Sequence, residues 1–312
     1  MRRFFVLMGI FVLAGLSSAA CAKTQYRPEY VRGDLRPSFA EAQGRTRSYL
    51  KKAAIAPQDR PTGSFAAQAD DLFSETLVAS IQARANRLQL LTPRETGFPE
   101  FMRNATLFAA PEAVYAMAET ARLQGYHHLL RATVLHVRAS ERKTGIWWFR
   151  KTRYFMTVAV AVDVYDTFTA AKISSHVKEK TVKIDTGDYE AYQSGVQNNI
   201  TAVDKAVAGM ARDLGRQAAR VIRSTPWKAV VAAVNAERIE LAAGRAVGLQ
   251  VGDRWAVYEG RRKIEGYDGA RFIVPGYKVG TIYLTAVEDA TAQARADGNA
   301  DIRAGDIAIP IR

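Results

Sequence analysis

The spacing of apolar side chains divides the first half of the chain into alternating strands and helices. Residues 51–57 are typical of a short strand, and residues 67–86 place apolar side chains at helical spacing. A second strand is expected over residues 88–92. It leads to a helix that begins at Pro111 and ends before Gly125. Proline is common at the first position of a helix, and glycine is common just after its end. The pattern therefore predicts a strand–helix–strand–helix opening.

Longer elements are expected next. Residues 127–140 and 153–165 are rich in Val, Thr and aromatic residues and flank a tight charged link, which predicts an antiparallel pair. Residues 171–184 alternate enough to add a third strand. From Ile200 to Val221 apolar residues recur every three to four positions, which predicts a long amphipathic helix with one face packed on the sheet.

The pattern changes after Pro226, where helical spacing ends and short apolar strands alternate with glycine-containing turns. In this part Gly248 and Gly252 supply permissive backbone, Asp253 can cap the turn, and Trp255 alternates into the core. The chain is therefore expected to have an α+β fold. An α/β domain with a mixed sheet and packed helices is followed by a small β-barrel domain.

Residues 1–21 are typical of a secretory signal peptide. Two arginines precede an apolar run over residues 4–16, and small residues follow it up to Cys21. The run is shorter than the ~20 apolar residues that a membrane-spanning helix needs. Residues 22–50 mix proline and glycine with many charges and have no sustained apolar period, so a tether is expected there.

The position of Cys21 resembles the lipobox of bacterial lipoproteins, in which the cysteine is acylated and becomes the first residue. The match departs at Ser18, where that family prefers leucine. The alternative is ordinary cleavage after Ala22, which would discard the thiol. Ala22 in place of aspartate resembles lipoproteins sorted to the outer membrane. This resemblance implies a periplasmic protein held by lipid at the inner leaflet of that membrane.

Composition narrows the function classes. With 48% hydrophobic and 24% charged residues, the chain can bury a sizeable core, which excludes wholesale disorder. A single cysteine excludes a disulfide framework and any cysteine-rich metal site. The net charge is +13, and the two signal-peptide arginines leave +11 for the rest. Export would keep this charge away from nucleic acid, so no nucleic-acid partner is expected.

Few residues are arranged as a metal-binding or catalytic site requires. His127 and His128 are adjacent on a predicted strand, so their side chains should point to opposite faces and could not chelate one ion. Asp297, Asn299 and Asp301 imitate half of a calcium loop, but residue 302 is isoleucine where that loop needs glycine. No nucleophile elbow, phosphate loop, dinucleotide fingerprint or zinc-protease helix is present. We therefore expect no catalytic residue, metal or cofactor, and no enzyme.

One segment is hard both to solvate and to bury in a small domain. It is the link over residues 141–152, whose centre is Ile146, Trp147, Trp148 and Phe149, followed by Arg150 and Lys151. Tryptophans flanked by cations suit a bilayer interface, and tryptophan is also a common anchor in protein interfaces. We expect these six residues to contact a partner or a membrane. The alternative is a hairpin folded back so that its aromatic residues cover the sheet edge or the barrel.

A second charged surface is expected on the long helix. Its face away from the sheet carries the basic residues Lys205, Arg212, Arg216, Arg220 and Arg223. The simplest interpretation is a solvated helix face, and the alternative is contact with an anionic lipid or glycan surface. Arg212, Arg216 and Arg220 are the candidate contact residues.

The sequence of the second domain resembles a known family. Three stretches carry the resemblance: GRAVGLQVGDRWAVYE at residues 244–259, Val279–Ile282, and Arg303–Asp306. They resemble the carboxy-terminal domain of flagellar assembly protein T, which implies an SH3-like barrel over residues 227–312.

Residues 51–226 look like the α/β domain shared by the amino-terminal part of the Tol translocation β-propeller protein and the curli-secretion lipoproteins. The motifs are ARLQGYHHLLRAT at residues 121–133 and VAVDVYDTFTAAKI at residues 160–173. Together the resemblances imply a non-enzymatic assembly component of an envelope machine, most simply flagellar basal-body ring assembly. The implied partners are envelope or flagellar ring proteins, with the chain itself forming a homo-oligomeric ring. The alternative is a Tol-like or curli-like transport or secretion accessory that acts by protein binding.

Overall fold

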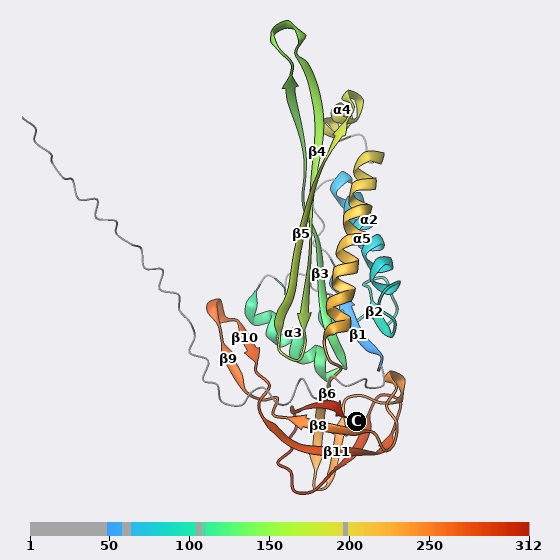
Figure 1. Ribbon diagram of the computed structural model, residues 1–312, viewed down its shortest axis with the longest axis vertical. Coiled ribbons are helices and arrows are strands. Elements are labelled where there is room, and N and C mark those ends of the chain that lie inside the picture. The colour runs from blue at the N-terminus through green and yellow to red at the C-terminus, as the bar shows by residue number, and fades with distance from the viewer. Residues whose placement is uncertain (1–48, 58–63, 104–107, 109, 196–198, 312) are drawn as a thin grey trace, which may run out of the picture. The chain divides into compact units, whose positions relative to one another are not determined.

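The computed structural model describes residues 49–57, 64–103, 108, 110–195 and 199–311 (Figure 1). The signal peptide expected over residues 1–21, with Cys21, lies outside the described residues, as does all but the end of the expected tether. No helix in the described part of the chain is long and apolar enough to span a membrane.

A mixed five-stranded sheet forms the first part of the described chain (Figure 1). Its strands are β1 (Lys51–Ile55), β2 (Leu88–Leu91), β3 (Tyr126–Thr144), β4 (Lys151–Asp166) and β5 (Ala171–Ile184). They lie in the order β2-β1-β3-β4-β5. β1 is parallel to β2 and β3, whereas β3, β4 and β5 pair antiparallel in sequence. The predicted opening unit and the three antiparallel strands are therefore confirmed.

Helices cover both faces of this sheet, because alternate strand residues are apolar on both sides near its base. The helices are α2 (Ser64–Gln82), α3 (Pro111–Leu123), α4 (Thr186–Ser194) and α5 (Thr201–Ser224). α2 and α5 pack side by side on one face (Figure 1), where Phe73 and Leu77 meet Val158, Val160 and Val207 in a fully buried core. α3 packs on the other face.

α2 and α5 approach each other closely at Gly215. A Cβ atom at this position would lie 2.6 Å from the Cβ of Ser80. The Ser80 hydroxyl donates a hydrogen bond to the backbone carbonyl of Arg212 at 2.9 Å. The close approach explains a glycine inside a long helix, where glycine otherwise destabilises.

The second part of the described chain is a closed barrel with the strand order β11-β12-β7-β6-β13-β8. These strands are β6 (Ala229–Asn235), β7 (Arg238–Leu241), β8 (Arg254–Tyr258), β11 (Lys278–Val287), β12 (Ala292–Ala296) and β13 (Ile307–Ile311). A two-stranded arm, β9 (Lys263–Glu265) and β10 (Arg271–Ile273), leaves the barrel and contacts α3. The predicted α+β fold class, with a mixed sheet followed by a small barrel, is confirmed. The 3-10 helices whose residues are all described are η1 (Glu100–Met102), η3 (Trp147–Phe149), η4 (Arg245–Val247) and η5 (Tyr267–Gly269).

The glycine-rich motif of the barrel has the predicted local structure. Gly248 and Gly252 have φ angles of +100° and +88°, in the left-handed region that favours glycine. A carboxylate oxygen of Asp253 accepts the backbone N–H of Gln250 at 2.9 Å, which caps the turn. Trp255 is fully buried in the barrel core.

Two residues of the expected tether contact the barrel. The ring of Tyr49 lies 5.2 Å from that of Trp227 and 5.3 Å from that of Trp255. The Trp227 indole N–H donates to the carbonyl of Leu50 at 3.0 Å. The packed part of the chain therefore begins by Tyr49, before β1, because this tyrosine completes the aromatic core of the barrel.

Two features of the long hairpin differ from expectation. β3 and β4 extend past the predicted residues 127–140 and 153–165, and their pairing continues to Thr144 opposite Lys151. Within the described part of the chain this end packs on no helix, and the apolar alternation that marks a strand is absent from it. The short helix α4 was not predicted, although Asp185 caps its start and Gly195 ends it with φ of +70°.

Candidate functional site

The end of the β3–β4 hairpin is a tight turn that needs a glycine. Gly145 has φ of +115°, and a Cβ atom there would lie 2.4 Å from the carbonyl oxygen of Phe149. Trp147 also adopts a left-handed conformation, with φ of +52°. Such a conformation is uncommon for a bulky residue and persists where other contacts fix the chain. The turn holds four consecutive apolar side chains at the end of the hairpin.

These four side chains, which we call the hairpin tip, are exposed. The exposed fractions are 82% for Ile146, 70% for Trp147, 78% for Trp148 and 76% for Phe149. The two indole rings contact each other, with centroids 4.9 Å apart and planes at 70°. The folded-back arrangement, in which the aromatic residues would cover the sheet edge or the barrel, is therefore not the one in the structure.

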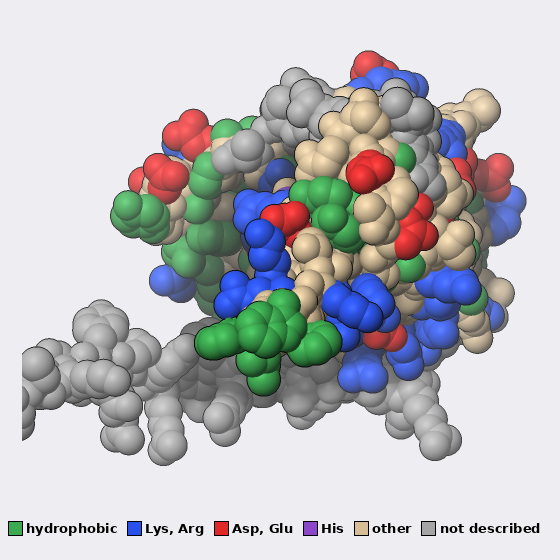
Figure 2. Space-filling view, turned by 90° about the horizontal axis from the view of Figure 1, so that it is seen from above, with side chains coloured by type: hydrophobic (Ala, Val, Ile, Leu, Met, Phe, Trp, Pro, Cys, Tyr) green, Lys and Arg blue, Asp and Glu red, His purple; other side chains and the backbone are tan. Residues whose placement is uncertain are grey.

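Cations surround the hairpin tip (Figure 2). Arg142 and Arg153 are directly opposite in the strand pairing, and Arg150 and Lys151 follow the apolar residues. In the described part of the chain, none of these four forms a salt bridge, and Arg142 lies over the ring of Phe155 at 5.1 Å. Like charges facing each other across strands destabilise a hairpin. A partner with negative charge would relieve this repulsion.

α4 supports the hairpin below its tip. The ring of Tyr189 stacks on Tyr154 of β4 with centroids 4.4 Å apart. The hydroxyl of Tyr192 donates to the carbonyl of Val137 on β3 at 3.2 Å, and its ring meets Phe65 of α2 edge-on. Among the described residues these helix contacts end at Tyr154, so strand pairing and local side-chain contacts hold the segment beyond it.

The basic face of α5 is partly neutralised by its own helix. Arg212, Arg216 and Arg220 are all exposed. Arg216 forms an ion pair with Asp213, which also accepts a hydrogen bond from Lys178 of β5 at 2.5 Å. The hydrogen bond from Lys178 is the main cause that lowers the pKa of Asp213. Of the three candidate contact residues, Arg216 is therefore paired within the protein.

The adjacent histidines lie closer together than a regular strand allows. A bulge in the pairing of β1 with β3 leaves His127 between the paired residues Tyr126 and His128. The two rings are stacked, with centroids 6.5 Å apart, so the prediction that they point to opposite faces is wrong. Burial lowers the pKa of both well below the usual value, which keeps them neutral. Among the described residues no group of three His, Cys, Asp or Glu could hold a metal ion.

The residues that imitate a calcium loop lie in and after the bend that follows β12. Gly298 in this bend has φ of +86°, in the left-handed region that favours glycine. Asp297 forms an ion pair with Arg254, and Asp301 forms one with Arg303 at 2.9 Å. Their carboxylates are therefore directed to arginines rather than toward a shared centre.

Sequence reasoning missed a polar cluster where the sheet meets the barrel. Lys228 and Asp166 form a buried ion pair, with 3.1 Å between Nζ and Oδ2. Lys51 lies in the same region and donates to the carbonyl of Ile222 at the end of α5. No local motif joins these residues. The only sequence signal was a pair of adjacent histidines inside an otherwise apolar strand.

Neither a protein-family model nor a curated protein sequence matches this chain. Solved structures to which it is similar include a minor lipoprotein from Acinetobacter baumannii, with 12% identity and a TM-score of 0.29, covering 55% of this chain and 95% of that one. A PelC dodecamer from Paraburkholderia phytofirmans has 15% identity and a TM-score of 0.28, covering 54% and 85%. A hypothetical protein from Chlamydia trachomatis has 13% identity and a TM-score of 0.30, covering 55% and 95%. Structural similarity this low does not show that this chain assembles or acts as those proteins do.

Proposed function

We propose that this chain is a non-enzymatic envelope component that acts by binding, with the hairpin tip as its docking element. The exposure of Ile146, Trp147, Trp148 and Phe149 carries the proposal. Burial of one tryptophan at the centre of an interface contributes ~2 kcal/mol or more. The surrounding cations favour an acidic partner surface and disfavour a basic one.

The sequence supports a location and a machine for this role. Acylation of Cys21 would hold the chain at the inner leaflet of the outer membrane, on the periplasmic side. The resemblance of residues 244–259 to flagellar assembly protein T supports a role in basal-body ring assembly, with ring proteins as partners and several copies of this chain around the ring. The resemblance of residues 160–173 supports the alternative, a transport or secretion accessory.

The docking role is tested with the double substitution Trp147→Ala and Trp148→Ala. The purified wild type should co-sediment with envelopes of the source bacterium, and the double variant should bind about tenfold less tightly or worse. Its melting temperature should stay within about 1 °C of the wild type, because the tip packs on no core. The matched control is Tyr267→Ala with Tyr277→Ala, which removes two exposed rings elsewhere.

The same assay separates a protein partner from a lipid surface. Protease treatment of the envelopes should abolish binding by the wild type. Binding to vesicles of phosphatidylglycerol and phosphatidylethanolamine should be weak. Strong vesicle binding would assign the tip to the membrane. A double variant that is destabilised yet still co-sediments would refute the docking role.

The anchor and the machine need separate tests. Radiolabelled palmitate should enter the wild type and be absent from Cys21→Ala, whereas a mature terminus at Lys23 would exclude acylation. Deletion of the gene should abolish swimming and remove rings from isolated basal bodies. Wild-type protein should restore both, and the tip variant should not. A deletion strain that swims normally would direct attention to the secretion alternative.

A further inference from the structure

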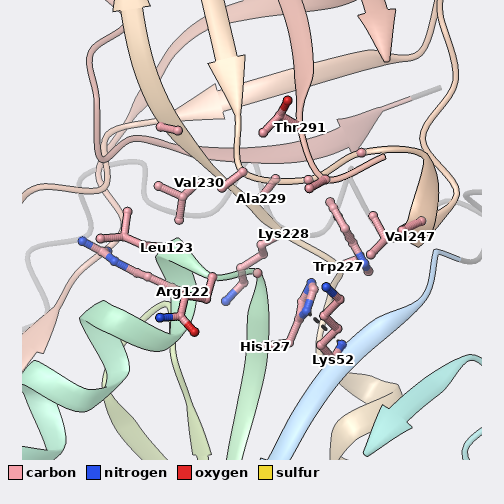
Figure 3. Close-up of a pocket in the computed structure, with 18 of the residues that line it drawn as sticks. Lys52, Arg122, Leu123, His127, Trp227, Lys228, Ala229, Val230, Val247 and Thr291 are labelled. Atoms are coloured by element: carbon pink, nitrogen blue, oxygen red, sulfur yellow. Dashed lines mark hydrogen bonds between the residues drawn. The ribbon is translucent and has the colours of Figure 1, made fainter. Parts of the chain in front are cut away.

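A cavity of about 320 Å³ lies between the base of the sheet and the barrel (Figure 3). Three cationic side chains line it, those of Lys52, Arg122 and Lys228. The rest of the wall is mostly apolar and includes Leu123, Phe168, Trp227, Val230 and Val247. Its volume lies at the lower end of the range for small-molecule sites, which are usually apolar with a few directing polar groups.

Arg122, at the end of α3, carries unused hydrogen-bond donors. Its side chain is 6% exposed, and its ion-pair partner is Glu119, with 3.5 Å between Nη2 and Oε1. Nε and Nη1 have no hydrogen-bond partner among the described residues. A buried guanidinium with unsatisfied donors is costly, and a carboxylate is the group that satisfies two of its N–H groups at once.

His127 adds another donor to the same wall. Its Nδ1 accepts the backbone N–H of Lys52 at 3.4 Å (Figure 3). Because the ring is neutral, this bond places its hydrogen on Nε2. Nε2 has no partner among the described residues. The buried ring therefore leaves an unsatisfied donor, and no free acceptor, in this wall.

The acidic groups near the cavity do not neutralise its sheet end, which stays positive. Asp166 is already bound to Lys228 at 3.1 Å. Asp289, on the barrel side, is exposed and pairs with Arg245 at 3.3 Å. Glu240, also in the barrel-side wall, is the remaining carboxylate of the lining. The cations and free donors thus gather at the sheet end.

We propose that this cavity binds a small organic carboxylate with an apolar, ring-sized body. The carboxylate would accept hydrogen bonds from Arg122 on the α3 side of the cavity, and the body would extend toward Trp227 and His127 on the β1 side (Figure 3). An inorganic anion would satisfy the donors but leave the apolar wall uncovered. An amine would meet only cations and donors at the sheet end. The site is independent of the hairpin tip, and so is its test.

Phenylacetate is the probe, with acetate and 2-phenylethylamine as comparisons. The full chain is titrated by heteronuclear NMR, and the indole N–H signal of Trp227 is identified by its loss in Trp227→Phe. Phenylacetate should shift this signal with a millimolar dissociation constant, as expected for a fragment of its size. Acetate should bind about tenfold less tightly, and the amine should cause no saturable shift. Equal shifts from all three, or none from phenylacetate, would overturn the proposal.

Two variants test the donors. Arg122→Gln should weaken phenylacetate binding about tenfold, whereas Arg103→Gln, an exposed arginine outside the cavity lining, should not change it. Lys52→Gln, on the half-buried rim, should weaken binding several-fold and serves if Arg122→Gln does not fold. Unchanged affinity in every folded cavity variant would overturn the assignment of these residues.

Discussion

Lys51 shows how one residue joins local structure to stability. Its ammonium donates to the carbonyls of Ile222 and Thr225 at the end of α5, where a helix favours positive charge. Burial, helped by the nearby positive charge of Lys228, lowers the pKa of Lys51 to about 8, and Asp166 opposes this shift. The protonated ammonium of Lys51 donates these hydrogen bonds, whereas burial and the charge of Lys228 disfavour that protonated form.

The free energy of unfolding of the wild type should change with pH in the alkaline range, because Lys51 titrates there. Its pKa is about 8 in the fold and 10.5 in the unfolded chain, so the unfolded chain binds more protons between these values. The free energy of unfolding should rise across this interval, by at most about 3 kcal/mol. Lys51→Met should lack the rise. Urea denaturation at intervals from pH 7 to pH 10 measures it, and parallel profiles for both proteins would contradict the assignment.

The buried ion pair should be sensitive to loss of one partner. Asp166→Asn leaves the Lys228 ammonium buried without its counter-charge, which should cost about 3–5 kcal/mol. Asp213→Asn removes two ion pairs that are partly exposed, and it should cost about 1 kcal/mol or less. Denaturant midpoints at pH 7 compare the two variants. Similar losses would show that Lys228 reaches solvent.

At the scale of elements, the part of the fold with apolar alternation could be predicted from sequence. β5 has the predicted bounds, and α3 begins at the predicted proline. The outer part of the hairpin could not be predicted, because its residues pair with each other but pack on nothing. The hairpin tip was evident from composition, but its exposure depends on where α4 stops supporting the strands. The cavity could not be foreseen, since only the tertiary fold brings Arg122 and Lys228 to the same cavity.

The turn of the hairpin should depend on Gly145. Gly145→Ala places a Cβ against the carbonyl of Phe149 at a positive φ, which should cost about 1–3 kcal/mol locally. Hydrogen exchange of residues 141–153 should accelerate while the melting temperature stays nearly unchanged. Gly195→Ala is the control, since φ there is +70° but no atom lies within 4 Å. Unchanged exchange near the tip would mean that the turn does not limit hairpin opening.

At the scale of the whole described chain, the barrel depends on residues far from it in sequence. Tyr49 completes its core, and Asp166 neutralises Lys228 at its first strand. Phe168 packs with Val230 and Tyr258 of the barrel. The barrel therefore has its own apolar core and is also stabilised by contacts with residues of the α/β part.

A fragment that starts at Lys228 should fold but be less stable than the same residues in the full chain. It keeps the closed set of six strands and lacks Tyr49 and Asp166. Dispersed amide signals and a lowered melting temperature are the expected results. Full-length Tyr49→Ala, which should lose about 3 kcal/mol, serves as the matched variant. A fragment with collapsed amide dispersion would contradict a domain boundary near Pro226.

The length of β3 sets a fixed spacing within the described chain. The strand runs from Tyr126, next to His127 of the cavity, to Thr144 beside the hairpin tip, a span of about 60 Å at ~3.3 Å per residue. Two residues removed from each of β3 and β4 would shorten this span by about 7 Å and keep every side chain on its face, whereas one residue would invert them. The hairpin therefore fixes the distance between the barrel end and any surface that contacts the tip. This distance can change only in steps of two residues if every side chain is to stay on its face.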